Sequence, residues 1–495
     1  MSTNSLSEER QVVPRWRSFQ RSTRGKGLQS LRRPADRPPP DISALRTEAD
    51  RSDNEWVIAD YLGALISSGR STIERQSVAE RLVAITRDPV LRDWARSVAQ
   101  DESRSGAGST APFVQDAKQR AQTAIPRLRR RLIDRPRDAV ARVDLALAHL
   151  LLGNHQQARR QMFGALQLGP TNRFVVRGAA TLFATLDEPD LGYWALTSEN
   201  LHRHDPWVMA SSLALAGLAD RRADVRSARE LLALGGFSPA DTSELTSELG
   251  TLEVLSGKRT RARQLFSDSL EVPNDNTLAQ ATWASDELDL DLGLDRSSLQ
   301  GAYEAQVRAH VRSGAWEEGF NAGILWQTDQ SFSQAAALTT SFIAAVGLED
   351  YEAALRVTEV GLRVNPGDGA LRNNAAFAAA QLGRLDEAEQ YLAGIGLLDN
   401  PDEAHTVEAT RGLIAFRRGD VEAGRRLYGR ARDGFVESKS AQQAVMAVLH
   451  WALEEVRISP QSLLALLEPA RESVQRYPSA EGTLLLQRLE SRRPA

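Results

Sequence analysis

The sequence predicts an all-α solenoid, a stack of antiparallel helix pairs preceded by a basic N-terminal tail. Residues 335–368 align with residues 369–402 at an offset of 34 residues, so that Ala354 falls on Ala388. Small residues recur where two helices would cross, and glycine or proline recurs where a helix would end. A period of this length is typical of helix pairs that each need their neighbours to bury an apolar face.

The composition is that of a globular protein without cysteine chemistry. The chain has 495 residues, of which 42% are hydrophobic and none is cysteine, which excludes disulfides and thiolate metal sites. This chain is longer than a single hydrophobic core usually serves. A repeat array is not subject to that limit, because each unit packs only on its neighbours. No apolar run approaches the ~18–20 residues of a spanning helix, and no apolar signal segment begins the chain. We therefore expect a cytoplasmic protein without membrane contact.

Residues 1–52 are expected to form a disordered tail. The first 40 residues hold nine Arg or Lys and three Asp or Glu, and the run at 34–40 holds four prolines that cannot continue a helix. Apolar residues then return at helical spacing, which predicts an N-terminal helical segment over 53–100. Residues 101–111 have no apolar face and are read as a linker.

The repeat array is expected over 112–437. The unit at 139–172 shows its pattern, with Gly153 at the turn, Ala158 at the helix crossing and Pro170 at the end. Glycine supplies the left-handed backbone conformation that ends a helix, and proline stops the second helix. Residues 277–299 break the pattern, and residues 438–490 are expected to be capping helices. The units begin near residues 105, 139, 173, 209, 243, 300, 335, 369 and 405; the turn glycines are Gly153, Gly257, Gly314, Gly383 and Gly419, and the crossing alanines are Ala158, Ala228, Ala262, Ala354 and Ala388.

These spacings resemble the tetratricopeptide repeat superfamily, in a bacterial-type form with no recognisable subfamily. The resemblance covers roughly residues 105–437. It is carried in one unit by Leu145-Ala146, His149, Gly153, Ala158, Ala165-Leu166 and Pro170, in another by Leu249-Gly250, Gly257, Ala262, Phe266 and Leu270, and in a third by Tyr351, Ala354, Gly361-Leu362 and Pro366.

Stacked helix pairs curve, so the first helices are expected to line a concave groove that holds a peptide or helix of another protein. Asparagine can hold a peptide backbone through its amide, and Phe and Arg are common energetic anchors. Our leading hypothesis is a non-enzymatic adaptor or scaffold that binds a partner protein in this groove and regulates an effector. The residues expected to be exposed there are Glu304, Arg308, Arg312, Asn373, Asn374, Phe377, Gln381, Leu413, Phe416 and Arg417.

Two alternatives remain open. The first is a nucleic-acid-associated protein in which the basic tail and an arginine cluster contact phosphates; the competing interpretation of that cluster is a solvated helix face. The overall net charge of −4 does not favour nucleic acid as a partner. The second is a non-catalytic substrate-recognition subunit of an enzyme complex. The cluster consists of Arg127, Arg129, Arg130, Arg131, Arg135 and Arg137.

Three motifs superficially suggest chemistry, but none has the required spacing. Residues 257–260 (GKRT) lack the glycine spacing and the hydroxyl residue of a phosphate loop. His202 and His204 lie two apart, whereas helical metal ligands need a spacing of four. The acidic run at 286–295 lacks the twelfth-position glutamate of a calcium loop. The sequence therefore predicts no catalytic residue, metal site or cofactor.

Overall fold

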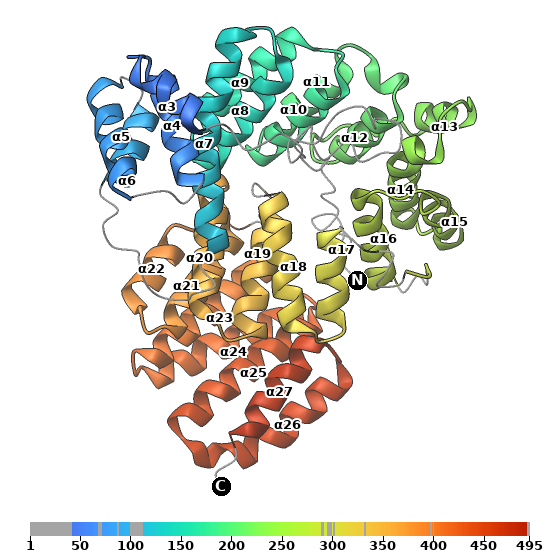
Figure 1. Cartoon of the computed structure of the whole chain (residues 1–495). Helices are drawn as coiled ribbons and strands as arrows, with labels where there is room; N and C mark the ends of the chain where they lie inside the picture. The colour runs from blue at the N-terminus through green and yellow to red at the C-terminus, as the bar shows by residue number, and fades with distance from the viewer. Residues whose placement is uncertain are drawn as a thin grey trace. The chain divides into compact units, whose positions relative to one another are not determined.

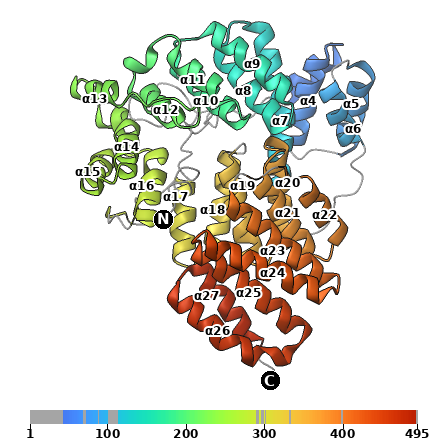
Figure 2. The same ribbon diagram turned by 180° about the vertical axis from the view of Figure 1, so that it is seen from behind.

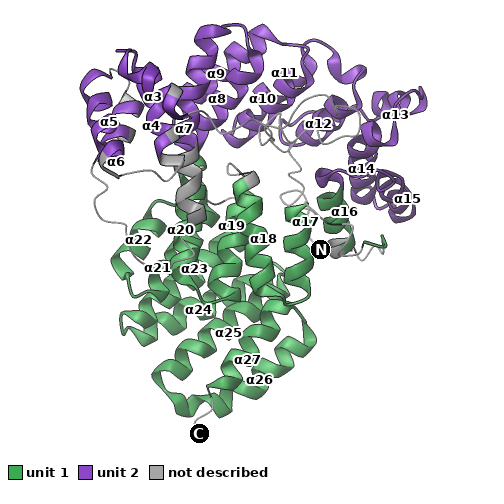
Figure 3. Ribbon diagram, in the orientation of Figure 1, with its two compact units in different colours: residues 1–9, 278–495 green, residues 10–277 purple. Residues whose placement is uncertain are grey.

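The computed structural model describes residues 42–67, 72–86, 89–99, 112–288, 292–294, 299, 302–330, 333–396, 398 and 400–492. Every regular element in these ranges is a helix, and they contain no strand, so the predicted all-α fold is confirmed (Figure 1). The described residues up to Thr277 belong to one compact unit and those from Leu278 to another (Figure 3). We call these the N-terminal unit and the C-terminal unit.

The N-terminal unit begins with helices that precede the repeats and continues with four helix pairs. Helix α16 (Asp275–Leu288) crosses the boundary between the two units. The other helices are α3 (Ile42–Asp50), α4 (Glu55–Ser67), α5 (Thr72–Ile85), α6 (Pro89–Ala99), α7 (Pro112–Asp134), α8 (Ala139–Leu151), α9 (His155–Leu168), α10 (Arg173–Thr185), α11 (Pro189–Thr197), η2 (Leu201–Arg203), α12 (Pro206–Ala216), α13 (Val225–Ala233), α14 (Pro239–Leu255) and α15 (Arg259–Ser269).

The C-terminal unit continues the same arrangement (Figure 2). Its helices are α17 (Tyr303–Arg312), α18 (Trp316–Asp329), α19 (Gln334–Phe342), the π-helical turn η3 (Ile343–Gly347), α20 (Tyr351–Val364), α21 (Gly369–Gln381), α22 (Leu385–Ala393), α23 (Pro401–Arg417), α24 (Val421–Glu437), α25 (Ala441–Ile458), η4 (Pro460–Ser462), α26 (Leu463–Arg476) and α27 (Ala480–Ser491).

Two kinds of packing build each unit. The first helix of each pair packs on its own second helix, as α8 does on α9 and α23 on α24. It also packs on the first helix of the next pair, so that α10 lies between α8 and α12, and α21 lies between α19 and α23. Each pair is therefore stabilised mainly by its neighbours in sequence, as expected of a repeat array.

Short-range capping explains where these helices begin and end. First helices of the N-terminal unit begin after side chains that accept a backbone N–H of the first turn: Asp138, Asn172, Asp205 and Ser238, spaced 34, 33 and 33 residues apart. The five predicted turn glycines all have φ between 69° and 88°. That conformation is costly for other residues, so glycine ends the first helix at these turns.

The predicted crossing alanines are fully buried, which lets the paired helices approach closely; they are Ala158, Ala228, Ala262, Ala354 and Ala388. At two pairs a glycine of the first helix has the same role. A Cβ on Gly250 would lie 3.3 Å from the Phe266 ring, and one on Gly412 would lie 2.8 Å from the Tyr428 ring. The aromatic ring fills the space that the missing side chain leaves.

The N-terminal part differs from the sequence expectation in one respect. Residues 42–50 form helix α3, although the tail was expected to extend to residue 52. Helices α3 to α6 share a small core of their own, and α4 packs on α7. Residues 1–41 of the expected tail and all of the expected linker lie outside the described residues. None of the helices that the structure describes combines the length and apolarity needed to cross a membrane.

Candidate protein-binding surface

The first helices α19, α21, α23 and α25 of the C-terminal unit follow one another, each in contact with the next. Residues at matching positions of successive first helices therefore meet although they are 33 to 37 residues apart in sequence. The side chains that meet in this way form a continuous polar and aromatic set. We call it the first-helix surface, and it consists of Asn374, Phe377, Gln381, Arg417, His450 and Glu454.

Arg417 connects three first helices. Its Nη2 donates to Gln381 Oε1 at 2.6 Å on α21 and to Glu454 Oε1 at 2.8 Å on α25. The Glu454 side chain is only 5% exposed, and its second oxygen accepts from Arg457 Nε at 2.7 Å. A buried carboxylate needs such paired guanidinium donors, because an unpaired buried charge is strongly unfavourable. Two guanidinium groups around one carboxylate leave a net positive charge here.

Phe377 supplies an aromatic element beside this polar network. Its ring centroid lies 6.4 Å from that of Tyr351 and 5.3 Å from that of His450, both edge to face. Burial lowers the pKa of His450 to about 4, and repulsion from Arg488 adds to that effect. His450 is therefore neutral at pH 7. Burial also raises the pKa of Tyr351 to about 12, so its hydroxyl keeps its proton.

Asn374 has its amide fixed by the preceding first helix. Its Nδ2 donates to Ser341 Oγ at 3.0 Å and to the Leu338 carbonyl at 3.4 Å. These two bonds orient the side chain and use its donors, while no described residue donates to its Oδ1. An oriented amide oxygen of this kind can accept a backbone N–H from a bound peptide.

Three of the predicted binding residues are not exposed, and that expectation was wrong. Asn373 is 6% exposed, and Leu413 and Phe416 are each 1% exposed. Leu413 and Phe416 belong to the core shared by α21, α23 and α24, where the Phe416 ring packs 6.0 Å from the Tyr428 ring. The amphipathic pattern of α23 thus turns these side chains toward its second helix.

The other predicted residues lie on α17. Glu304 and Arg308 form an ion pair one turn apart, with 3.6 Å between Oε1 and Nε, and both side chains are partly buried. Arg312, at the end of the helix, is exposed. The structure brings these three together on one helix and not into the first-helix surface. Their role in binding a partner stays a prediction.

The predicted phosphate-contacting arginines lie at the end of α7 and in the turn after it. Arg131 Nη2 lies 2.6 Å from Asp138 Oδ2, and Arg130 is paired with Glu48 of α3. Two of the six arginines are thus held by carboxylates, which lowers the positive charge available to phosphates. Arg129 is half-buried, and those that remain exposed are Arg127, Arg135 and Arg137.

A second polar network lies on the first helices of the N-terminal unit, and the sequence reading did not find it. Arg177 Nη2 donates to Glu244 Oε2 at 2.6 Å, although the two residues are 67 positions apart, or about two repeat periods. Arg177 Nε donates to Ser211 Oγ at 3.1 Å, and its guanidinium lies 5.1 Å from the Trp207 ring centroid. The sequence signal that could have revealed this network is the pair of oppositely charged residues, Arg177 and Glu244, about two repeat periods apart. The Glu454 network was missed because α25 was interpreted only as a cap.

The arrangement offers binding chemistry. Within the described ranges, no group of three or more His, Asp or Glu side chains is placed to hold a metal ion. The titratable groups of the first-helix surface are either paired, as Arg417 is with Glu454, or kept neutral by burial, as His450 is. Such groups can orient and contact a ligand.

The family comparison fits this geometry. Residues 345–409 match the family model described as tetratricopeptide repeat, and this range contains helices α20 to α22 and the start of α23. This part of the chain is a tetratricopeptide-repeat segment. The match supports the resemblance of the repeat array to the tetratricopeptide-repeat superfamily.

Two solved structures are similar to this chain at low identity. One is the APC/C hetero-tetramer Cut9–Hcn1, with 14% identity over 90% of this chain and 98% of that chain and a TM-score of 0.37. The other is yeast Tom70, with 11% identity over 91% of this chain and 95% of that chain and a TM-score of 0.31. At these TM-scores neither likeness bears on the function. No curated protein sequence matches the chain.

Proposed function

We propose that this protein is a cytoplasmic, non-enzymatic adaptor that holds a segment of a partner protein on the first-helix surface and thereby regulates that partner. The observation that carries the proposal is the network in which Arg417 connects Gln381 and Glu454 across three consecutive first helices. These contacts fix the side chains before any ligand arrives, which lowers the entropic cost of binding.

The chemistry of the surface suits a peptide segment with acidic or carbonyl groups. Arg417 and Arg457 share the single carboxylate of Glu454, so the network carries excess positive charge. Asn374 offers an oriented amide oxygen to a backbone N–H, and Phe377 offers a partly buried aromatic ring. Asn373, Leu413 and Phe416 contribute to the core under this surface and are not proposed as contacts.

Quantitative affinity purification tests the proposal. The tagged full-length protein is expressed in its native host, cross-linked in the cell and purified, and mass spectrometry quantifies the proteins recovered. We expect Asn374→Ala and Phe377→Ala each to lower recovery of the main partner at least tenfold. The control Arg259→Ala, on α15 of the other unit, is expected to recover wild-type amounts. Circular dichroism checks that each variant keeps its helical content.

Recovery of the same partners in the same amounts with both first-helix variants would refute the proposal. Asn374→Ala is the more decisive of the two changes. Asn374 is only half-buried, so its loss removes two hydrogen bonds without opening a cavity in the core.

A further inference from the structure

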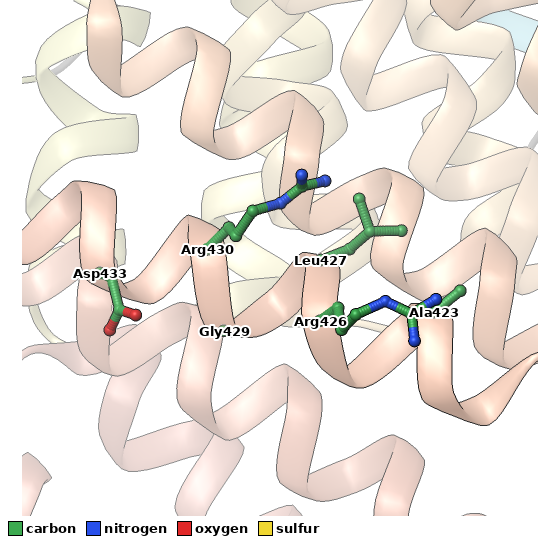
Figure 4. Close-up of a pocket in the computed structure, with 6 residues that line it drawn as sticks. All are labelled: Ala423, Arg426, Leu427, Gly429, Arg430 and Asp433. Carbon is green, nitrogen blue, oxygen red and sulfur yellow. The ribbon is translucent and has the colours of Figure 1, made fainter.

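Helix α24 has a hollow on the face that points away from its own core. Figure 4 shows the residues that line it along the helix, and its volume is about 500 Å³. Each of the positions 423, 426, 427, 430 and 433 lies three or four residues from another of them, so the hollow follows the helix axis. The opposite face of α24 packs inward through Tyr428, Ala431 and Phe435. The lining residues are Ala423, Arg426, Leu427, Gly429, Arg430 and Asp433.

Packing within this chain does not explain why residue 429 in this hollow is a glycine. Packing requires two other glycines of α24, since a Cβ on Gly424 would collide with the Phe416 ring and one on Gly434 with His405. A Cβ on Gly429 would meet nothing within 4 Å. Glycine inside a helix is less favourable than alanine, and it is common where another backbone approaches closely. The missing side chain at Gly429 therefore indicates a contact outside this chain's own packing.

The charges around the hollow indicate the nature of that contact. Arg430 is held by Glu408, with 2.7 Å between Nε and Oε1, and Asp433 is held by Arg432 at 2.7 Å. Arg426 is exposed, and no ion pair or hydrogen bond joins it to any part of the chain that the structure describes. Val436, seven residues after Gly429 on the same face, is 62% exposed. The hollow thus offers one unpaired guanidinium beside an apolar contact.

We propose that this hollow docks an acidic α-helix of a partner protein, separate from the first-helix surface. The docked helix lies along α24, places a carboxylate on Arg426 and brings its backbone close to Gly429. The stripe from 423 to 433 covers eleven residues and is about 15 Å long, which matches about three turns of helix. Side chains spaced three and four apart form the ridges on which a second helix packs.

A second copy of this chain is a poor occupant for the hollow. A symmetric contact would place the same face of α24 on both sides. The only carboxylate among the lining residues, Asp433, is already paired with Arg432, so a second copy would offer no free carboxylate from that lining to Arg426.

Three labelled helical peptides test the proposal by fluorescence anisotropy. The peptides are alanine-based and equal in length, and they carry Glu, Gln or Lys at one set of positions spaced four and three apart. We expect the wild-type full-length protein to bind the Glu peptide at least tenfold more tightly than the other two. Arg426→Glu and Gly429→Leu are each expected to weaken that binding at least tenfold. The matched charge reversal Arg259→Glu on α15 is expected to change it less than twofold.

Equal binding of the Glu and Gln peptides would overturn the proposal, and so would unchanged binding to Gly429→Leu. Sedimentation of the wild-type protein tests the other occupant. Self-association that Arg426→Glu abolishes would show that a second copy occupies the hollow, which also contradicts the proposal. Arg426 is exposed, and a Cβ on Gly429 would meet nothing within 4 Å, so circular dichroism is expected to show unchanged helical content for both variants.

Discussion

The ring of Tyr428 on α24 packs directly against the backbone of Gly412 on α23, where a side chain on Gly412 would stand 2.8 Å from Tyr428 Cδ2. Tyr428 is buried and forms part of the core between these helices, where its ring is stacked 6.3 Å from the Trp451 ring. The contact fixes the distance at which the two helices of this pair pack. Gly412 on α23 and Gly429 on α24 are therefore expected to respond in opposite ways to the same substitution, because a Cβ would collide with a ring at Gly412 and meet open space at Gly429.

Gly412→Ala is expected to lower the free energy of unfolding by about 1–3 kcal/mol, because overpacking forces the Tyr428 ring or the backbone to move. Gly429→Ala is expected to raise it by up to about 1 kcal/mol, since alanine is the better helix former and meets open space there. Urea unfolding followed by circular dichroism measures both. A lower free energy of unfolding for Gly429→Ala would contradict the finding that open space surrounds a Cβ at this position.

The Arg417 network predicts a non-additive pair of substitutions. Arg417→Met leaves the Glu454 carboxylate, which is 5% exposed, with Arg457 alone, and we expect a loss of about 1–3 kcal/mol. The double variant Arg417→Met, Glu454→Leu removes the charge together with its partner and should lose less than the sum of the two single changes. Chemical unfolding of all four proteins completes this cycle, and strictly additive losses would show that the two side chains do not interact.

Asp144 on α8 predicts a pH dependence for the N-terminal unit. Burial raises the pKa of this carboxyl from 3.8 to about 6, and Arg131 and Arg127 only partly oppose that effect. The folded state therefore holds the proton more tightly than the unfolded state, so this group contributes stability below about pH 4 that is lost as pH rises through about 6. Asp144→Asn is expected to raise stability at pH 7 by at most about 3 kcal/mol, since one pKa unit corresponds to about 1.4 kcal/mol.

The measurement for Asp144 is thermal unfolding from pH 4 to pH 8. The wild-type protein should lose stability relative to Asp144→Asn as pH rises across that range. A constant difference between the two proteins would show that the pKa of Asp144 is not raised in the folded state.

His450 on α25 predicts the opposite dependence for the C-terminal unit. Burial lowers the pKa of its imidazole from 6.5 to about 4, so the unfolded state binds the proton more tightly. The stability contributed by neutral His450 is present above about pH 6.5 and is lost as pH falls toward 4. His450→Gln should flatten this acid-induced loss. NMR titration of the His450 ring gives the direct check, and a midpoint near 6.5 would contradict the burial of this side chain.

The fold could be predicted from the sequence because its determinants are local. A turn glycine with positive φ, a crossing alanine and a side-chain cap each act within one helix pair, so the 34-residue period repeats them in readable form. The break in that period at 277–299 coincides with the place where the chain divides into two units. Helix α3 was missed because proline and arginine dominate the segment before it and conceal its short apolar pattern.

The candidate site could be predicted only in part. Asn374, Phe377, Gln381 and Arg417 do lie together, because residues about one period apart meet on successive first helices. Which face of α23 points inward depends on how the Tyr428 and Phe416 rings share the space beside Gly412 and Gly424, and spacing alone does not determine this. The partners His450 and Glu454 lie beyond the recognisable repeats, so no period pointed to them.

Hydrogen–deuterium exchange of the complex purified from the native host tests the central claim, that the first helices hold the partner. Compared with the free protein, the account predicts slower exchange in residues 369–381, 401–417 and 441–458, and Asn374→Ala should remove that protection together with the partner. Protection confined to the second helices, or a complex that forms equally well with Asn374→Ala, would contradict it.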